Sequence, residues 1–307
     1  MEMNNERLLW VDIAKGIGII LVILGHMIDG YSFAGRYIWS FHMPLFFFLS
    51  GLFMSETISI QLLLKRARQL LLPCCIFTII SCIVFHYAIE KSLDFLSVSL
   101  PVPLWFLPIL FLAEIECRFF ICKINVYLLL VFNLSVALLC QHYNIGTVYS
   151  ISSVFISSVF YLMGYLFQKY NMMREISVFV FMAILSIVPT MVYIFNVHTN
   201  IGNNTFTIVG IIVAILGIAQ VIILSKRLTM YKITSSVLSF MGRNSLVLML
   251  THMIFLQLYC HYIIISNQLL YKVIQLLFVF CMSIGSIFLF KGRLALLIGI
   301  KNKSICL

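Results

Sequence analysis

WVDIAKGIGIILVILGHMIDGYSFAGRYIWSFHMPLFFFLSGLFM, residues 10–54, decides the fold class of this chain. The stretch is almost entirely apolar and is long enough for two membrane spans. Five ionisable side chains nevertheless lie within or beside those spans, namely Asp12, Lys15, His26, Asp29 and His42. A charge near the bilayer centre costs about 2.5–3.5 kcal/mol on insertion scales, so these groups are candidates for a function.

The charged groups of the first span share one helix face. At about 100° per residue, the eleven steps from Lys15 to His26 return to within about 20° of the same direction, roughly 16 Å further along the axis. Asp12 lies three residues before Lys15 and therefore neighbours it on that face. One stripe of a buried helix thus carries an acid, a base and an imidazole.

The composition excludes a soluble globular protein. Of the 307 residues, 63% are apolar and 10% are charged, and the mean hydropathy is +1.10, values that are typical of a polytopic membrane protein. The net charge of +10 comes from basic residues in short loops, which indicates membrane orientation and no nucleic-acid partner. The nine cysteines lack the spacing of a metal site or a disulfide framework, and no metal site is expected from the histidines either.

A hydropathy window of about 19 residues predicts an all-α bundle of ten transmembrane helices. Their expected limits are 8–29, 37–55, 70–88, 103–121, 125–142, 149–167, 177–195, 205–224, 244–264 and 270–290. Short connections predict a single integral membrane domain over residues 1–307 with no appended soluble domain. The mixed charge of residues 1–7 and the lack of a small-residue cleavage site predict a retained first span and no cleaved signal peptide.

The Lys and Arg side chains divide unequally between the two sides of this bundle. Sixteen lie on one side: Arg7, Lys65, Arg66, Arg68, Arg118, Lys123, Lys169, Arg174, Lys226, Arg227, Lys232, Arg243, Lys291, Arg293, Lys301 and Lys303. Three lie on the other: Arg36, Lys91 and Lys272. This bias predicts that both termini are cytoplasmic.

Two readings remain open for the stripe of the first span. In the functional one, His26 is a general base, because an unperturbed imidazole takes a proton near neutral pH. In the structural one, Lys15 extends to the inner interface, Asp12 pairs with it, and the histidine bonds to a neighbouring helix. Asp29 either orients the His26 ring or is an interfacial residue.

Three further segments carry candidate binding residues. In SFHMPLFFFLSG, residues 40–51, His42 either lines the cavity of His26 or sits at a helix start whose first turn holds Pro44. In KRARQLLLP, residues 65–73, a basic loop is either an orientation signal or a site for phosphate or a lipid headgroup, with Lys65, Arg66 and Arg68 as ligands.

In PVPLWFLPILFLAEIE, residues 101–116, Trp105 is either a binding residue or part of an interfacial aromatic belt. Ser245 and His252 lie seven residues apart on one face of the ninth expected helix. They either line the same cavity as His26 or serve packing and hydrogen bonding.

These segments together resemble the acyltransferase 3 family of integral membrane acyltransferases. The resemblance covers essentially the whole chain. Its best parts are DIAKGIGIILVILGH (12–26), FHMPLFFFLSG (41–51), the basic segment before Pro73, LWFLPILFL (104–112) and MGRNSLVLMLTHM (241–253).

The resemblance implies ten helices and transfer of an acyl group, commonly acetyl from acetyl-CoA, to sugar hydroxyls of surface polysaccharides. The family's signature of an Arg, ten residues and an essential His falls here on Lys15 and His26, so the charge is kept and the guanidinium fork is lost. Its cytoplasmic Arg-x-x-Arg becomes Lys65-x-x-Arg68 or Arg66-x-x-Gln69. Family members often carry an extracytoplasmic esterase-like domain, and none is expected within these 307 residues.

The mechanism implied is transfer from a thioester to an alcohol in a bacterial-type cytoplasmic membrane. The CoA phosphates would lie near Lys65, Arg66 and Arg68, with Arg243 as a further candidate, and the pantetheine arm would reach into the bundle. His26 would deprotonate a hydroxyl of a glycan or lipid-linked sugar, while Lys15 with Asp12 would either stabilise charge or position the donor. Acyl-CoA is then a substrate, membrane lipid surrounds the protein, and no permanently bound cofactor is expected.

Two rival classes make different predictions. A proton-coupled transporter or flippase of a glycan-related solute would use the same His and Asp residues as a proton relay. A structural membrane subunit would keep its role when His26, Lys15 and His42 are replaced by alanine.

Overall fold

The computed structural model describes residues 8–85, 104–143, 145, 152–172, 178–197, 199, 201, 205–290 and 292–299, and in these residues the fold is helical without a β-sheet. Its elements are α1 Leu9–Met27, α2 Phe33–Gly51, α3 Ile60–Ile83, α4 Phe106–Ile121, α5 Val126–His142, α6 Ser152–Lys169, α7 Val178–Ile194, α8 Ile208–Leu228, α9 Lys232–Arg243, α10 Ser245–Tyr262, α11 Gln268–Leu289 and the 3-10 helix η3 Gly292–Ile298. The expected all-α class is confirmed.

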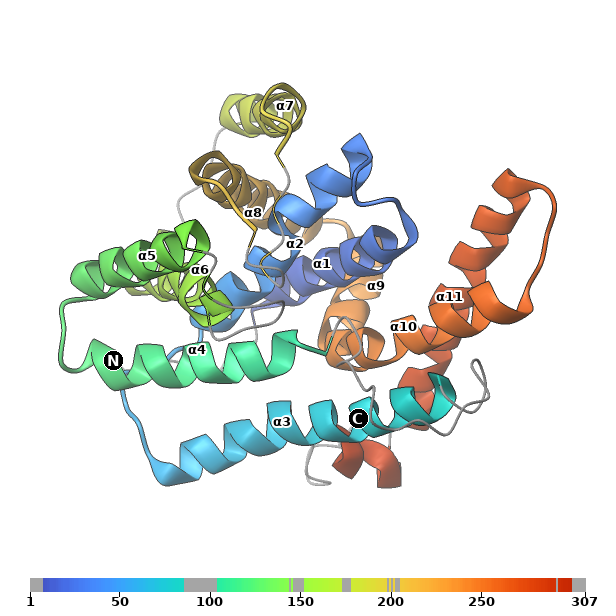
Figure 1. The fold of residues 1–307 in the computed structure, drawn as a ribbon, viewed down its shortest axis with the longest axis horizontal. Coiled ribbons are helices and arrows are strands. Elements are labelled where there is room, and N and C mark those ends of the chain that lie inside the picture. The colour runs from blue at the N-terminus through green and yellow to red at the C-terminus, as the bar shows by residue number, and fades with distance from the viewer. Residues whose placement is uncertain are drawn as a thin grey trace.

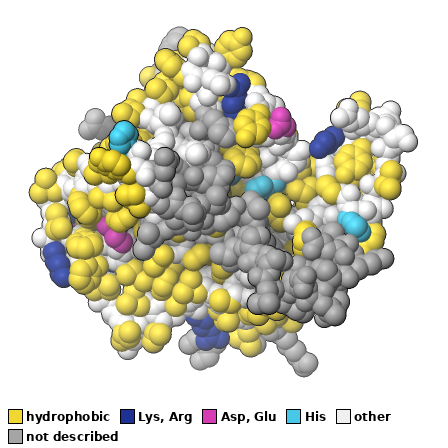
Figure 2. Space-filling view, in the orientation of Figure 1, with side chains coloured by type: hydrophobic (Ala, Val, Ile, Leu, Met, Phe, Trp, Pro, Cys, Tyr) yellow, Lys and Arg dark blue, Asp and Glu magenta, His cyan; other side chains and the backbone are white. Residues whose placement is uncertain are grey.

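Five of the described helices, α1, α3, α8, α10 and α11, are long and apolar enough to cross a membrane. Figure 2 shows hydrophobic side chains over much of one face, with charged side chains few and isolated, as a lipid-facing surface requires. The count of ten spans and the sides of the termini stay predictions. Six basic residues used for the orientation lie outside the described residues: Arg7, Lys91, Arg174, Lys291, Lys301 and Lys303.

Helix α1 lies at the centre of the bundle and packs against α2, α8, α9 and α10. Helix α2 packs in turn against α6 and α8, while α3 and α4 run side by side and α10 and α11 form a projecting pair (Figure 1). Two glycines bring α2 and α6 into backbone contact. A Cβ atom on Gly51 would lie 1.9 Å from the backbone carbonyl oxygen of Tyr161, and one on Gly164 would lie 2.0 Å from the backbone carbonyl oxygen of Phe48.

The sequence does not predict helix α9, because this twelve-residue segment is too short and too polar to register as a membrane span. It packs against α1 through two glycines that let the backbones meet. A Cβ on Gly16 would lie 2.1 Å from the Leu238 oxygen, and one on Gly242 would lie 1.8 Å from the Asp12 oxygen. This close contact holds α9 against the N-terminal part of α1, which carries Asp12.

Two expected boundaries are wrong. Helix α3 begins at Ile60, where Ser59 accepts a hydrogen bond from the Leu62 N–H at 3.2 Å, so the basic segment and Pro73 lie on a helix and not in a loop. Helix α2 begins at Phe33, where Ser32 accepts from the Gly35 N–H at 3.1 Å, so Pro44 lies in the helix interior and not in the first turn. In both segments the helix begins directly after a capping serine, earlier than the position of the proline had suggested.

Candidate active site

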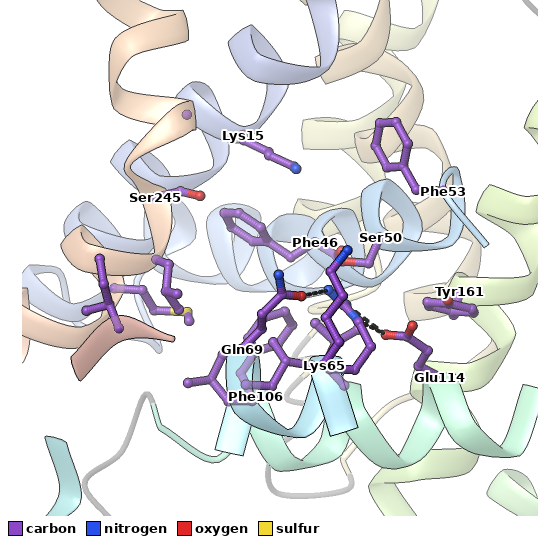
Figure 3. A pocket seen from close by; sticks show the side chains of 18 of the residues that line it. Lys15, Phe46, Ser50, Phe53, Lys65, Gln69, Phe106, Glu114, Tyr161 and Ser245 are labelled. Atoms are coloured by element: carbon purple, nitrogen blue, oxygen red, sulfur yellow. Dashed lines mark hydrogen bonds and ion pairs between the residues drawn. The ribbon is translucent and has the colours of Figure 1, made fainter. Parts of the chain in front are cut away.

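A cavity of 590 Å³ lies between the N-terminal ends of α1 and α10, the C-terminal end of α2, and helices α3 and α4 (Figure 3). Its lining includes six of the candidate residues named from the sequence, namely Asp12, Lys15, Lys65, Arg66, Arg243 and Ser245. The structure therefore brings together side chains that are up to 233 positions apart (245 minus 12).

The lining of this cavity is cationic. It holds five basic side chains, Lys15, Lys65, Arg66, Arg118 and Arg243, against the carboxylates of Asp12 and Glu114. Lys15 Nζ lies 5.6 Å from the centre of the Phe53 ring, and Figure 3 shows both side chains above Phe46. An excess of three positive charges suits a polyanionic ligand.

The Glu114 carboxylate organises one wall of the cavity. Arg66 donates to its Oε2 from Nε at 2.8 Å, with Nη2 at 2.7 Å, and Arg118 donates to its Oε1 from Nε at 3.0 Å, with Nη2 at 2.9 Å. Arg66 Nη1 also donates to Gln69 at 3.1 Å, and Figure 3 marks the bonds to Gln69 and Glu114. The sequence predicts no role for Glu114 and only an orientation signal for Arg118, because no local pattern joins these residues to α3.

Three histidines and a tryptophan form a cluster, called here the histidine cluster: His26 of α1, Trp39 and His42 of α2, and His252 of α10. The His26 ring centre lies 5.4 Å from that of His252 and 6.0 Å from that of Trp39. Trp39 lies 6.2 Å from His42 and donates from Nε1 to the Gly25 carbonyl at 3.0 Å. His26 is half-buried, whereas His42 and His252 are buried.

Backbone hydrogen bonds fix the tautomers of two of these rings. A carbonyl oxygen accepts, so the Nδ1 atoms of His42 and His252 carry the protons that they donate to Ile38 and Leu248, each at 2.9 Å. In the neutral form of each ring, Nε2 then carries the lone pair. For His252, which is fully buried, Nε2 has no hydrogen-bond partner among the described residues, and an orphaned acceptor of this kind costs about 1–3 kcal/mol.

The cavity and the histidine cluster adjoin along three helices. Phe46 and Met249 line the cavity. On α2, His42 lies four residues before Phe46, roughly 6 Å along the helix axis and away from the cavity. On α10, His252 lies three residues after Met249, roughly 4.5 Å along the axis. Lys15 and His26 stand at the two ends of the predicted stripe on α1. His42 and His252 are not among the residues that line this cavity, but both lie in the cluster that contains His26, so their sharing a site with His26 stays a prediction.

The remaining expected residues lie around this arrangement. Arg68 is half-buried on α3 outside the cavity lining. Trp105 is buried and packs against Phe106, whose ring lines the cavity, with 6.5 Å between ring centres, so it supports the cavity wall and is not part of an exposed belt. Asp29 accepts from the Tyr31 N–H at 3.0 Å in the exposed turn after α1. Within the described residues, no group of three His, Cys, Asp or Glu side chains is placed to hold a metal.

Comparison with known proteins identifies a family and a relative that matches part of the chain. A family model described as an acyltransferase domain matches residues 8–291. Nodulation protein NolL of Mesorhizobium japonicum (strain LMG 29417 / CECT 9101 / MAFF 303099) is 34% identical over 135 residues, which make up 38% of this chain and 36% of that protein. The match thus spans little more than a third of that relative's length. No solved structure matches the chain.

Proposed function

The chain belongs to the acyltransferase-domain family, and from this premise we propose that it transfers an acyl group, acetyl in the first instance, from acyl-CoA to a sugar hydroxyl. The observation that carries the proposal is the junction of a cationic cavity with a cluster of neutral-tautomer histidines inside an apolar bundle. One part suits a polyanionic donor, and the other suits proton transfer from an alcohol.

The donor occupies the cavity in this proposal. Lys65 and Arg243 are exposed at the cavity and neutralise the CoA phosphates, while the Glu114 carboxylate holds Arg66 in place beside them. Lys15 and Asp12 line the same cavity from α1 and position the pantetheine arm. In the orientation predicted from the basic residues, this end of the bundle faces the cytoplasm, where acyl-CoA is available.

His26 is the general base of the proposed reaction. It takes the proton of the acceptor hydroxyl, the oxygen attacks the thioester carbonyl, the C–S bond breaks, and the CoA thiolate leaves and is protonated. Such help is worth about 10²–10⁴-fold in rate. The proposed orienting group is His252, whose ring centre lies 5.4 Å from that of His26 and whose Nε2 has no partner among the described residues, so it is available to accept a hydrogen bond from the His26 ring during the reaction.

The acceptor is proposed to be a sugar of a surface polysaccharide or its lipid-linked precursor in a bacterial cytoplasmic membrane, where ten spans place both termini inside. The support is the family match and the likeness to a nodulation protein over part of the chain.

Complementation tests the proposal. Cells lacking the gene receive the wild-type chain, His26→Ala or His142→Ala, the last being an exposed histidine at the end of α5. We expect O-acyl groups on the cell's glycans, measured by mass spectrometry, to return with the wild-type chain and with His142→Ala and to stay absent with His26→Ala. Full acylation with His26→Ala, together with loss of uptake or export of a glycan-related solute, would establish the transporter class instead.

A further inference from the structure

Phe46 separates the cavity from the histidine cluster. Its side chain lines the cavity, and it lies four residues after His42, so the two side chains are neighbours on one face of α2. The Phe46 ring packs edge-on against that of Phe106, with 6.0 Å between ring centres. Any group that moves from the cavity toward the histidines along α2 meets this ring.

Helix α1 provides the space that the ring occupies. Lys15, Gly18, Val22 and His26 follow one another at intervals of three, four and four residues, so they lie along one stripe of the helix. Gly18 has no side chain, and a Cβ atom there would lie 3.0 Å from both Cε2 and Cζ of Phe46. The ring thus fills the gap in the stripe between Lys15 and His26.

The side chains of the inner wall are closely packed. Phe46 is 8% exposed, Phe106 4% and Met249 5%, and buried interiors pack at near-crystalline density with few voids. In the proposed reaction the acyl group leads the donor toward His26, so the acyl carbons are the part that touches this wall.

We propose that Phe46 sets the acyl-chain length that the protein accepts, limiting it to acetyl by closing the space beside Gly18. This inference rests on the proposed acyl-CoA-dependent function and adds the class of donor. One extra methylene in a hydrophobic pocket changes the specificity of an enzyme by about 10–200-fold. A shorter side chain at position 46 therefore relaxes the preference for acetyl.

A competition assay tests the inference. Membranes from cells that lack the gene, carrying the wild-type chain or a variant together with the native glycan, receive equimolar acetyl-CoA, butyryl-CoA and hexanoyl-CoA. The O-acyl groups that appear on the glycan are counted by mass spectrometry. Because the donors compete, the product ratio equals the ratio of their kcat/KM values and is independent of the amount of enzyme.

We expect the wild-type chain to transfer acetyl over butyryl by at least about tenfold. Phe46→Ala lowers this ratio by about tenfold or more, and Phe46→Leu lowers it by less. Phe48→Ala is the matched control, because Phe48 is buried to a similar degree (4% exposed) but packs against Phe167 of α6, 5.5 Å away between ring centres. Its acetyl-to-butyryl ratio stays at the wild-type value.

Three results would overturn the inference. One is an unchanged ratio in Phe46→Ala, or in Phe46→Leu where the alanine variant does not fold. Another is a shift in Phe48→Ala as large as that in Phe46→Ala, which would show general loosening of the bundle. The third is a wild-type chain that already transfers butyryl as readily as acetyl. Failure of the proposed function itself is distinct, since wild-type membranes would then form no O-acyl groups of any length.

Discussion

The substitution Glu114→Gln removes the negative charge that two guanidinium groups share on the cavity wall. Arg66 and Arg118 each approach the carboxylate with two nitrogens, at 2.7 to 3.0 Å. Glutamine has nearly the same shape but offers one acceptor oxygen and one NH₂ group. One arginine therefore keeps an acceptor, and the other faces a donor.

The cost follows from burial. Removing one partner of a buried ion pair costs about 3–5 kcal/mol, because a charge is left uncompensated. The Arg118 side chain is 5% exposed and the Arg66 side chain 29%, so Arg66 recovers part of its hydration and the lower end of that range applies. At about 2 °C per kcal/mol for a chain of this size, a loss of about 3 kcal/mol lowers the Tm by about 6 °C.

The assay is thermal unfolding of the purified protein in detergent, with Glu116→Gln as the control. Glu116 is half-buried on the same helix and accepts from Asn133 at 3.1 Å. An amide oxygen at that position still accepts this bond, so the control costs less than about 1 kcal/mol. Equal Tm values for the two variants would refute the reasoning. We also expect Glu114→Gln to raise the KM for acetyl-CoA, because Arg66 loses its fixed position at the cavity.

Two further predictions concern the frame around the site. Gly164→Ala pushes a methyl group against the α2 backbone, 2.0 Å from a carbonyl oxygen, and should lower the free energy of unfolding by about 1–3 kcal/mol or more. Gly285→Ala is the control, because a methyl group there has nothing within 4 Å. It should raise the free energy of unfolding by about 0.5–1 kcal/mol, as measured by thermal unfolding. Hydrogen bonds from Tyr165 and Lys169 lower the pKa of the Glu56 carboxyl. The stabilisation that Glu56 contributes is therefore present above the ordinary Glu pKa of about 4.3. It is lost as the pH falls through the lowered pKa of the folded state. Glu56→Gln should therefore flatten the dependence of Tm on pH below about pH 4.3, and an unchanged slope would contradict the assignment.

Much of the fold was accessible from the sequence because membrane helices depend on local composition. Apolar runs of about 20 residues identify helices with little help from tertiary contacts. Their ends were less accessible. Ser32 and Ser59 start α2 and α3 earlier than expected, since a serine side chain that satisfies an N–H in the first turn extends a helix beyond the hydrophobic stretch. Helix α9 was not predicted because its twelve residues are too short and too polar to register as a span, and its packing against α1 is a tertiary contact that no local pattern marks.

The site was predictable where it depends on one helix and not where it depends on several. Helical periodicity places Lys15 and His26 on one stripe, and the structure retains that stripe with Gly18 between them. The pairing of Arg66 with Glu114 joins positions 48 residues apart, and no local pattern in either helix marks it. The same limit applies to His252, because helical periodicity places it on the face of Ser245 and leaves open whether that face meets His26, 5.4 Å away between ring centres.

The separation of the two halves of the site follows from a physical conflict between their requirements. Phosphates of a CoA donor need water-accessible cations, whereas a base that must take a proton from an alcohol benefits from a site that excludes water. In this chain α1 carries a cation near one end and an imidazole near the other, and the Phe46 ring keeps the intervening stretch apolar. A substitution that widens this stretch therefore has two effects: it admits longer acyl groups, and it lets water reach His26. We accordingly expect Phe46→Ala to release CoA from acetyl-CoA by hydrolysis when no glycan is present, and tight coupling of CoA release to glycan acylation in that variant would show that water is excluded by some other group.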